Sequence, residues 1–152
     1  MLFLSPADRS IVLIKRVIAV PGDHIRIRHK VVILNGTALD EKYVSLKSDK
    51  EEPLLDDIPN ESYFQGCAEG HEILSQHVVN GEIVVPAGEY FVLGDNRENS
   101  LDSRCWGFVN FNDLIGKPLM IYDSEDKIEG EESSPNLHWV LQTRWSRIFT
   151  VF

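Results

Sequence analysis

Short apolar runs separated by turn-forming residues dominate most of the chain. The runs that read as strands lie at residues 11–20, 24–28, 30–34, 37–39, 89–93, 106–109 and 114–122. Asn35-Gly36 between two of them is a strong hairpin signal, because both residues readily adopt the positive φ angles of a tight turn. Pro118 argues for an edge strand or a bulge in the last run, since proline cannot donate a ladder hydrogen bond. The pattern predicts a mainly β architecture.

The longest apolar run, residues 11–20, contains two adjacent cations, Lys15 and Arg16. With a period of two, each cation falls among apolar neighbours on its own face of the strand, so we expect both faces to be buried. A buried ammonium loses hydration, and its pKa then falls below the free value of about 10.4. Lys15 is therefore either a neutral amine that can act as a general base, or a side chain that buries its methylenes while its charge reaches water.

A dense polar segment, residues 94–104, follows directly after the apolar run 89–93. Because that run is expected to be a buried strand, the polar groups after it begin at the edge of the core and need partners there. Asp102 and Arg104 stand two apart, on one side of an extended segment, where they either pair with each other or brace the backbone. The alternative is a Gly-Asp-Asn turn followed by a polar surface loop.

Composition and charge narrow the classes of protein that fit this chain. Its 152 residues, 43% of them apolar, suffice for one compact domain with an ordinary core. The formal net charge is −9 and the 15 cations are scattered, which argues against nucleic acid as a partner. No apolar stretch approaches the roughly 18 residues of a transmembrane helix, and the first residues lack a signal-peptide pattern. We expect the chain alone to be soluble.

Two segments together carry a resemblance to a known family. Residues 14–23 and 94–107 resemble two sequence boxes of bacterial type I signal peptidases in their order, separation and surroundings. Residues 82–90 resemble the family's entry into the strand before the second box. The resemblance extends over about residues 2–122 and implies a mainly β fold, a signal-peptidase-like β-sheet or barrel domain with a variable β insertion. Glu98 stands where the family often has Asp, a mild departure.

The resemblance also implies a role for each polar residue of the boxes. Lys15 would be the general base of a serine/lysine dyad, and Ser100 would be the hydroxyl that hydrogen-bonds to its amine and orients it. The supporting residues would be Asp102 and Arg104 as an ion pair, and Asp95 and Arg97 as polar contacts that hold the loop. The chemistry agrees, because a lysine activates a serine only when desolvation keeps its amine neutral.

The family's nucleophilic serine has no counterpart that we can assign in this sequence. In the family it lies in a Ser-Met-x-Pro-like motif after a transmembrane segment, whereas residues 1–6 resemble the end of a later strand and the turn after it. Ser5 is expected to be a turn residue before Pro6 rather than a substitute nucleophile. We therefore expect a fragment or misassigned start of a longer signal peptidase, inactive as given.

Composition suggests how the chain is divided. Residues 1–122 are expected to form the catalytic β domain, with a polar, less ordered insertion at about residues 40–81. Residues 123–136 are acidic and typical of a solvated linker. Residues 137–152 form an amphiphilic tail, and its two tryptophans and two arginines suit either a membrane interface or packing on the core.

Cysteine and histidine usage indicates no cofactor and no metal site. Cys67 and Cys105 form no Cys-x-x-Cys pair, and a disulfide between them is not expected. Cys105 stands where the family usually has an aromatic or aliphatic residue, so we expect it to pack as a small apolar side chain. The five histidines lack metal-ligand spacing and are expected to be solvated or hydrogen-bonded.

The function implied by the resemblance is that of a serine endopeptidase that removes N-terminal signal peptides from secretory precursor proteins. Precursors and a membrane lipid surface would be its partners, and the domain would lie on the extracytoplasmic face of the inner membrane. The alternative is a noncatalytic β module kept as a binding domain or pseudoenzyme. The presence of both Lys15 and Ser100 favours the peptidase, because burying a lysine is unfavourable without a use for it.

Overall fold

The computed structural model describes residues 1–44, 56–60 and 67–119. The strands in these ranges are β1 (Leu2–Leu4), β2 (Val12–Ile14), β3 (Arg16–Ala19), β4 (His24–Arg28), β5 (Val31–Leu34), β6 (Thr37–Ala38), β7 (Val78–Val79), β8 (Glu82–Val84), β9 (Glu89–Leu93), β10 (Val109–Asn110) and β11 (Leu114–Gly116). The helices are α2 (Ala68–Ser75) and α3 (Ser103–Trp106), with 3-10 turns η1 (Arg97–Asn99) and η2 (Phe111–Asp113). The prediction of a mainly β fold is confirmed.

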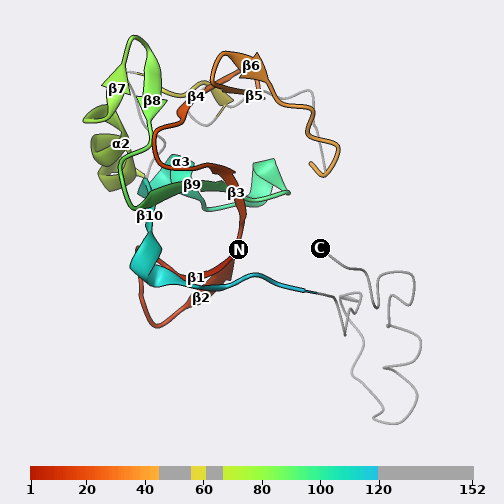
Figure 1. Cartoon of the computed structure of the whole chain (residues 1–152), viewed down its shortest axis with the longest axis vertical. Coiled ribbons are helices and arrows are strands. Elements are labelled where there is room, and N and C mark those ends of the chain that lie inside the picture. Colours follow the sequence, from red (N-terminus) through yellow and green to blue (C-terminus); the bar gives the residue numbers. More distant parts are fainter. Residues whose placement is uncertain (45–55, 61–66, 120–152) are drawn as a thin grey trace, which may run out of the picture. The chain divides into compact units, whose positions relative to one another are not determined.

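The described strands form three antiparallel sheets, shown in Figure 1. Their strand orders are β11-β1-β2, β10-β9-β3 and β6-β5-β4-β8-β7. The hairpin predicted at Asn35-Gly36 is confirmed, because these residues connect β5 to β6 with φ angles of 50° and 79°. All three sheets belong to one compact unit, Met1–Gly116, and a second unit spans Lys117–Phe152.

Strand β9 contributes to two hydrophobic clusters. Phe91 and Leu93 belong to a large cluster that also contains Ile25 of β4 and Ile83 of β8. Val92 points to the opposite face of the strand and packs in a smaller cluster with Phe3 and Val109. Because Phe91, Val92 and Leu93 are buried, the polar segment that begins at Gly94 starts at the edge of the core, as the sequence predicted.

The expectation of one strand buried on both faces over residues 11–20 is wrong. The chain changes sheets at Lys15, because β2 lies at the edge of the β11-β1-β2 sheet whereas β3 pairs with β9. Ile18 and Ala19 of β3 are buried, but Val12 and Ile14 of β2 are 52% and 53% exposed. An apolar run thus marked two short strands with different surroundings.

The expectation that Cys105 packs as a small apolar side chain, without a disulfide, is also wrong. Cys105 forms a disulfide with Cys67, and the two Cα atoms are 4.4 Å apart. Helices α2 and α3, which lie beside each other in Figure 1, also approach closely at Gly70, where a Cβ atom would lie 2.1 Å from the Cys105 carbonyl oxygen. Sequence spacing did not reveal this pairing because the cysteines are 38 positions apart.

Several element predictions differ from the structure in the second half of the chain. Residues 106–109 were expected to be a strand. Trp106 instead ends α3, and Val109 is the one residue of these four that lies in a strand, β10. Helix α2 lies within the insertion expected at residues 40–81 and was not predicted. Residues 45–55 and 61–66 of that insertion, the linker at 123–136 and the tail at 137–152 lie outside the described residues.

Neither α2 nor α3 is long and apolar enough to cross a membrane.

We predict that the Cys67–Cys105 disulfide stabilises the fold by about 3 to 4 kcal/mol, because it closes a long loop in the unfolded chain. Urea denaturation with and without a reductant measures the effect, and the midpoint should fall when the bond is reduced. A Cys67→Ser, Cys105→Ser double variant should have the lower midpoint, and the reductant should not change that midpoint. Equal midpoints for oxidised and reduced protein would contradict the prediction.

Candidate active site

The structure brings Lys15 and Ser100 together. Lys15 lies where the chain crosses from β2 to β3, and Ser100 follows η1. The Lys15 Nζ atom donates a hydrogen bond of 2.7 Å to Ser100 Oγ across 85 positions of sequence. The contact implied by the two boxes is therefore present.

The surroundings of Lys15 favour its neutral form. Burial lowers the pKa of the Lys15 amine below its ordinary 10.5, because the ammonium loses hydration. The Asp102 carboxylate opposes this shift and the Arg104 guanidinium adds to it. At any pH below the ordinary value, a larger fraction of this amine can accept a proton than of a free lysine.

The residue at position 94 must be small for Ser100 to reach Lys15. A Cβ atom built on Gly94 would lie 2.2 Å from Ser100 Oγ and 3.5 Å from Lys15 Nζ. The first distance is far inside van der Waals contact. Glycine at the end of β9 therefore creates the space in which the serine hydroxyl meets the amine.

A buried ion pair closes the Ser100 loop, which we define as residues 94–104. Asp102 and Arg104 side chains are 0% and 3% exposed, and two guanidinium nitrogens donate to the carboxylate at 2.8 and 2.9 Å. The Gly94 N–H also donates to Asp102, at 3.0 Å. The predicted pairing is confirmed, although not along an extended segment, because Asp102 caps the N-terminus of α3 and Arg104 lies in its first turn.

The two other predicted supporting residues connect the Ser100 loop to the rest of the domain. Asp95 accepts two hydrogen bonds from Arg16 of β3, at 2.7 and 2.8 Å. Chiefly because of this contact, the pKa of Arg16 is raised. Arg97 donates through both terminal nitrogens to Glu41, and their side chains are 11% and 7% exposed. Both pairs are bidentate, the geometry in which Arg best fixes a carboxylate.

Sequence reasoning missed three residues that take part in these contacts: Arg16, Glu41, and Tyr43, whose hydroxyl donates a hydrogen bond to Glu41. Arg16 was considered only as a cation among apolar neighbours, and Glu41 and Tyr43 fell in the polar insertion. The available signal was indirect: two arginines close to a buried strand need carboxylate partners, but the insertion contains many acids and its pattern does not identify Glu41. Ser103 was also missed, and its hydroxyl accepts a hydrogen bond of 2.8 Å from the buried Val92 N–H.

The chemistry available at this site is proton transfer by an oriented amine. Among the described residues, no cluster of His, Cys, Asp or Glu could hold a metal ion. Lys15 is half-buried, hydrogen-bonded to one hydroxyl and next to the exposed edge strand β2. A bound molecule on that edge would meet a base with a lowered pKa.

We predict that Gly94→Ala separates Ser100 from Lys15, because the added methyl group cannot fit beside Ser100 Oγ. Water would then reach the amine, and the pKa of Lys15 would rise toward 10.5. The pH dependence of acylation at Lys15, followed by mass spectrometry, measures this. Gly116→Ala is the matched control, since a Cβ there has nothing within 4 Å. An unchanged Lys15 midpoint in Gly94→Ala would contradict the prediction.

We also predict that Lys15→Met stabilises the protein near neutral pH. Because the pKa of Lys15 is lower in the folded state than in the unfolded chain, the penalty for burying the ammonium is fully present below the folded pKa. That penalty shrinks as pH rises to the unfolded value of about 10.5, so the advantage of the variant should shrink with it. Urea denaturation from neutral pH to pH 10.5 tests this, and a stability difference independent of pH would refute it.

Comparison with known proteins identifies the family of this chain. The family model described as signal peptidase, peptidase S26, matches residues 1–122. Signal peptidase I of Rickettsia typhi is 34% identical over 97% of this chain, and that of Buchnera aphidicola is 31% identical over 85%. Signal peptidase I of Bacillus caldolyticus is 40% identical over 68% of the chain.

This chain covers only part of the length of these relatives, but it covers most of one solved structure. The chain spans 62%, 54% and 50% of the lengths of the Rickettsia, Buchnera and Bacillus proteins. The crystal structure of a signal peptidase I from Enterococcus faecalis superposes with a TM-score of 0.56 at 31% identity, covering 76% of this chain and 89% of that one. With the family model matching most of its length, this chain belongs to the signal peptidase family, peptidase S26.

Proposed function

We propose that this domain is the catalytic part of a serine endopeptidase that removes signal peptides from secretory precursors. In it, Lys15 is the general base and Ser100 is the hydroxyl that orients it. The observation that carries the proposal is the 2.7 Å hydrogen bond from the desolvated Lys15 amine to Ser100. The resemblance of both boxes and the names of the relatives support the same reaction.

The proposed reaction is acyl transfer. Neutral Lys15 Nζ takes the proton from the attacking serine hydroxyl, whose oxygen adds to the scissile carbonyl carbon. The resulting ammonium returns the proton to the leaving amine, and an acyl-enzyme remains. Lys15, neutral again, then takes a proton from a water molecule whose oxygen attacks the acyl carbon. It gives that proton to the serine oxygen as the acyl–oxygen bond breaks. The attacking serine that the resemblance implies is not among the residues assigned here.

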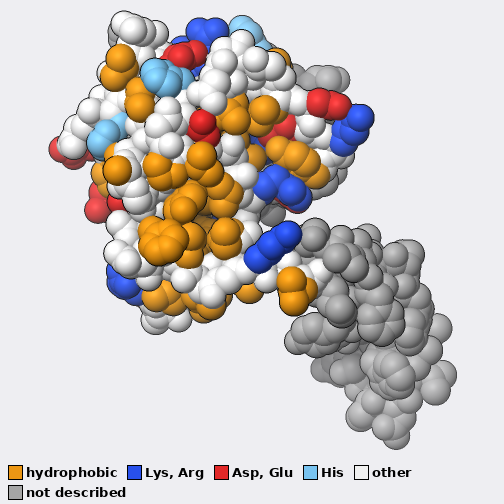
Figure 2. Space-filling view, viewed as in Figure 1, with side chains coloured by type: hydrophobic (Ala, Val, Ile, Leu, Met, Phe, Trp, Pro, Cys, Tyr) orange, Lys and Arg blue, Asp and Glu red, His pale blue; other side chains and the backbone are white. Residues whose placement is uncertain are grey.

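The free edge of strand β2 is the proposed binding site for the substrate. It lies at the edge of its sheet among the described strands, so its free side can accept an extended peptide as an additional strand. Val12 and Ile14 are about half exposed there and offer apolar contact. Figure 2 shows hydrophobic side chains gathered in the region where Figure 1 places β1, β2 and β10. A peptide on β2 would run toward Lys15, which follows Ile14 directly.

The Cys67–Cys105 disulfide supports the proposed location. Disulfides persist in oxidising compartments, so a domain that carries one fits the extracytoplasmic face of the inner membrane. The proposed contact with membrane lipid depends on the tail at residues 137–152, which lies outside the described residues. That contact stays a prediction.

We predict that Lys15→Ala lowers precursor cleavage by about 10²- to 10⁴-fold, the usual contribution of a general base. The assay uses the full open reading frame that encodes this chain, a purified precursor with small residues before its cleavage site, and mass spectrometry of the products. Ser100→Ala should reduce the rate less, because the amine remains but is poorly oriented. Lys42→Ala is the control, since the Lys42 side chain is 86% exposed.

One outcome decides the proposal, and another decides the expectation about the attacking serine. Equal rates for the wild type and Lys15→Ala would refute it. Cleavage by residues 1–152 alone, lost in Lys15→Ala, would place the attacking serine within this chain and overturn the expectation drawn from the sequence.

A further inference from the structure

Two residues outside both sequence boxes, Glu41 and Tyr43, contact the Ser100 loop and β3 at the same time. They follow the β5–β6 hairpin, in the short segment that ends the first described range. We call Glu41 and Tyr43 the clamp. Neither residue touches Lys15 or Ser100 in the contacts described above, so any influence on the dyad must pass through the loop.

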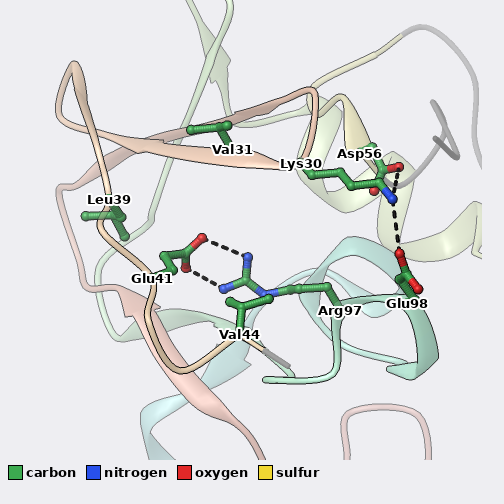
Figure 3. A pocket seen from close by; sticks show the side chains of 8 residues that line it. All are labelled: Lys30, Val31, Leu39, Glu41, Val44, Asp56, Arg97 and Glu98. Carbon is green, nitrogen blue, oxygen red and sulfur yellow. Dashed lines mark hydrogen bonds and ion pairs between the residues drawn. The ribbon is translucent and has the colours of Figure 1, made fainter. Parts of the chain in front are cut away.

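Glu41 binds the Ser100 loop through Arg97, a residue that is itself hydrogen-bonded to both ends of the loop. Its carboxylate pairs with both terminal nitrogens of Arg97, as Figure 3 shows. Arg97 Nε donates to the Gly94 carbonyl at 3.1 Å, and the Arg97 carbonyl accepts a 2.7 Å hydrogen bond from Arg104. Arg97 is thus bonded to both ends of the loop. With both partners nearly buried, this charge pair is little screened by solvent.

Tyr43 joins this pair to the second anchor of the loop. Its hydroxyl donates a 2.8 Å hydrogen bond to Glu41, and its ring lies 3.9 Å from the guanidinium carbon of Arg16. Arg16 holds Asp95 and is the chain neighbour of Lys15. Burial, together with Glu41, raises the pKa of Tyr43 to about 12, so the hydroxyl remains a donor while Lys15 titrates.

The clamp is connected to the Ser100 loop by polar contacts rather than by continuous packing. A pocket of about 80 Å³ lies between them, lined by Val31, Leu39 and Val44 and by charged residues that include Glu41 and Arg97. In Figure 3 the Glu41–Arg97 pair crosses this space, and the Lys30–Glu98 pair bridges it at another point. Removing the Glu41–Arg97 pair would therefore remove a polar contact that holds the loop across this pocket.

We propose that Glu41 and Tyr43 are positioning residues that hold the Ser100 loop so that Ser100 Oγ stays against Lys15 Nζ. Glu41 fixes the loop through Arg97. Tyr43 holds the Glu41 side chain by its hydrogen bond and the Arg16 side chain by its ring. The effect on cleavage rests on the proposed function, whereas the effect on the Lys15 amine does not.

The test measures the titration midpoint of Lys15 in the whole chain, by acylation with acetic anhydride over a pH series and mass spectrometry. Glu41→Gln should raise the midpoint toward 10.5, because a displaced loop lets water reach the amine. Tyr43→Phe keeps the ring over Arg16 and removes only the hydrogen bond to Glu41, so it should cause a smaller rise.

Two controls separate positioning from general loss of stability. Asp40→Asn changes a neighbouring acid whose side chain is 76% exposed, and should leave the midpoint unchanged. Val32→Ala opens a cavity at a fully buried site on β5 and should lower stability without moving the midpoint. An unchanged midpoint in folded Glu41→Gln would overturn the proposal. If Glu41→Gln does not fold, an unchanged midpoint in Tyr43→Phe overturns it.

Cleavage assays of the full open reading frame add a second readout. Glu41→Gln should lower kcat at least tenfold with little change in KM, because the loop positions the base and not the substrate. If the wild type cleaves no precursor while Glu41→Gln still shifts the Lys15 midpoint, the proposed function fails and the positioning role stands. If Lys15→Ala abolishes cleavage while Glu41→Gln changes neither kcat nor the midpoint, the positioning role fails and the proposed function stands.

Discussion

The carboxylate of Asp102 has no exposed surface and accepts hydrogen bonds from both ends of the Ser100 loop, the Gly94 N–H and the Arg104 guanidinium. A buried carboxylate is tolerated only when its charge and its lone pairs are satisfied, so the loop has few alternative conformations that keep this group inside. The same carboxylate attracts the proton of Lys15 and limits how far the pKa of the amine falls. One group therefore restrains the loop and also moderates the fall in the Lys15 pKa that burial causes.

The dyad depends on parts of the molecule that are far apart in the sequence. Lys15 is fixed by the change of sheets between β2 and β3, and Ser100 by a loop that starts at the end of β9. Because β3 pairs with β9, the two segments emerge next to each other. Helix α2, joined to α3 by the disulfide and by the close approach at Gly70, supports the loop from the side of the insertion.

Local sequence pattern predicted part of the fold and part of the candidate site. The Asn-Gly hairpin and the buried strand before Gly94 followed from local pattern, because each depends on residues close together in the chain. For Asp102 and Arg104 the local pattern left two alternatives, and the family resemblance implied the ion pair that the structure contains. The meeting of Lys15 and Ser100 was accessible only through the family resemblance. The partners Glu41 and Cys67 were not predictable, since nothing in a polar insertion indicates which acid or thiol the tertiary fold will select. The exposure of β2 was also not predictable, because an apolar run in the sequence does not show whether other elements of the fold pack against it.

Strand β9 has a consequence for how the domain loses its structure. Because Phe91 and Leu93 pack in one hydrophobic cluster and Val92 in the other, neither cluster can open without exposing one face of the same strand. Cooperative units of unfolding follow shared burial of this kind. The two halves of the core should therefore open together, and the end of β9, from which the Ser100 loop departs, should be among the last backbone to exchange its amide protons with solvent.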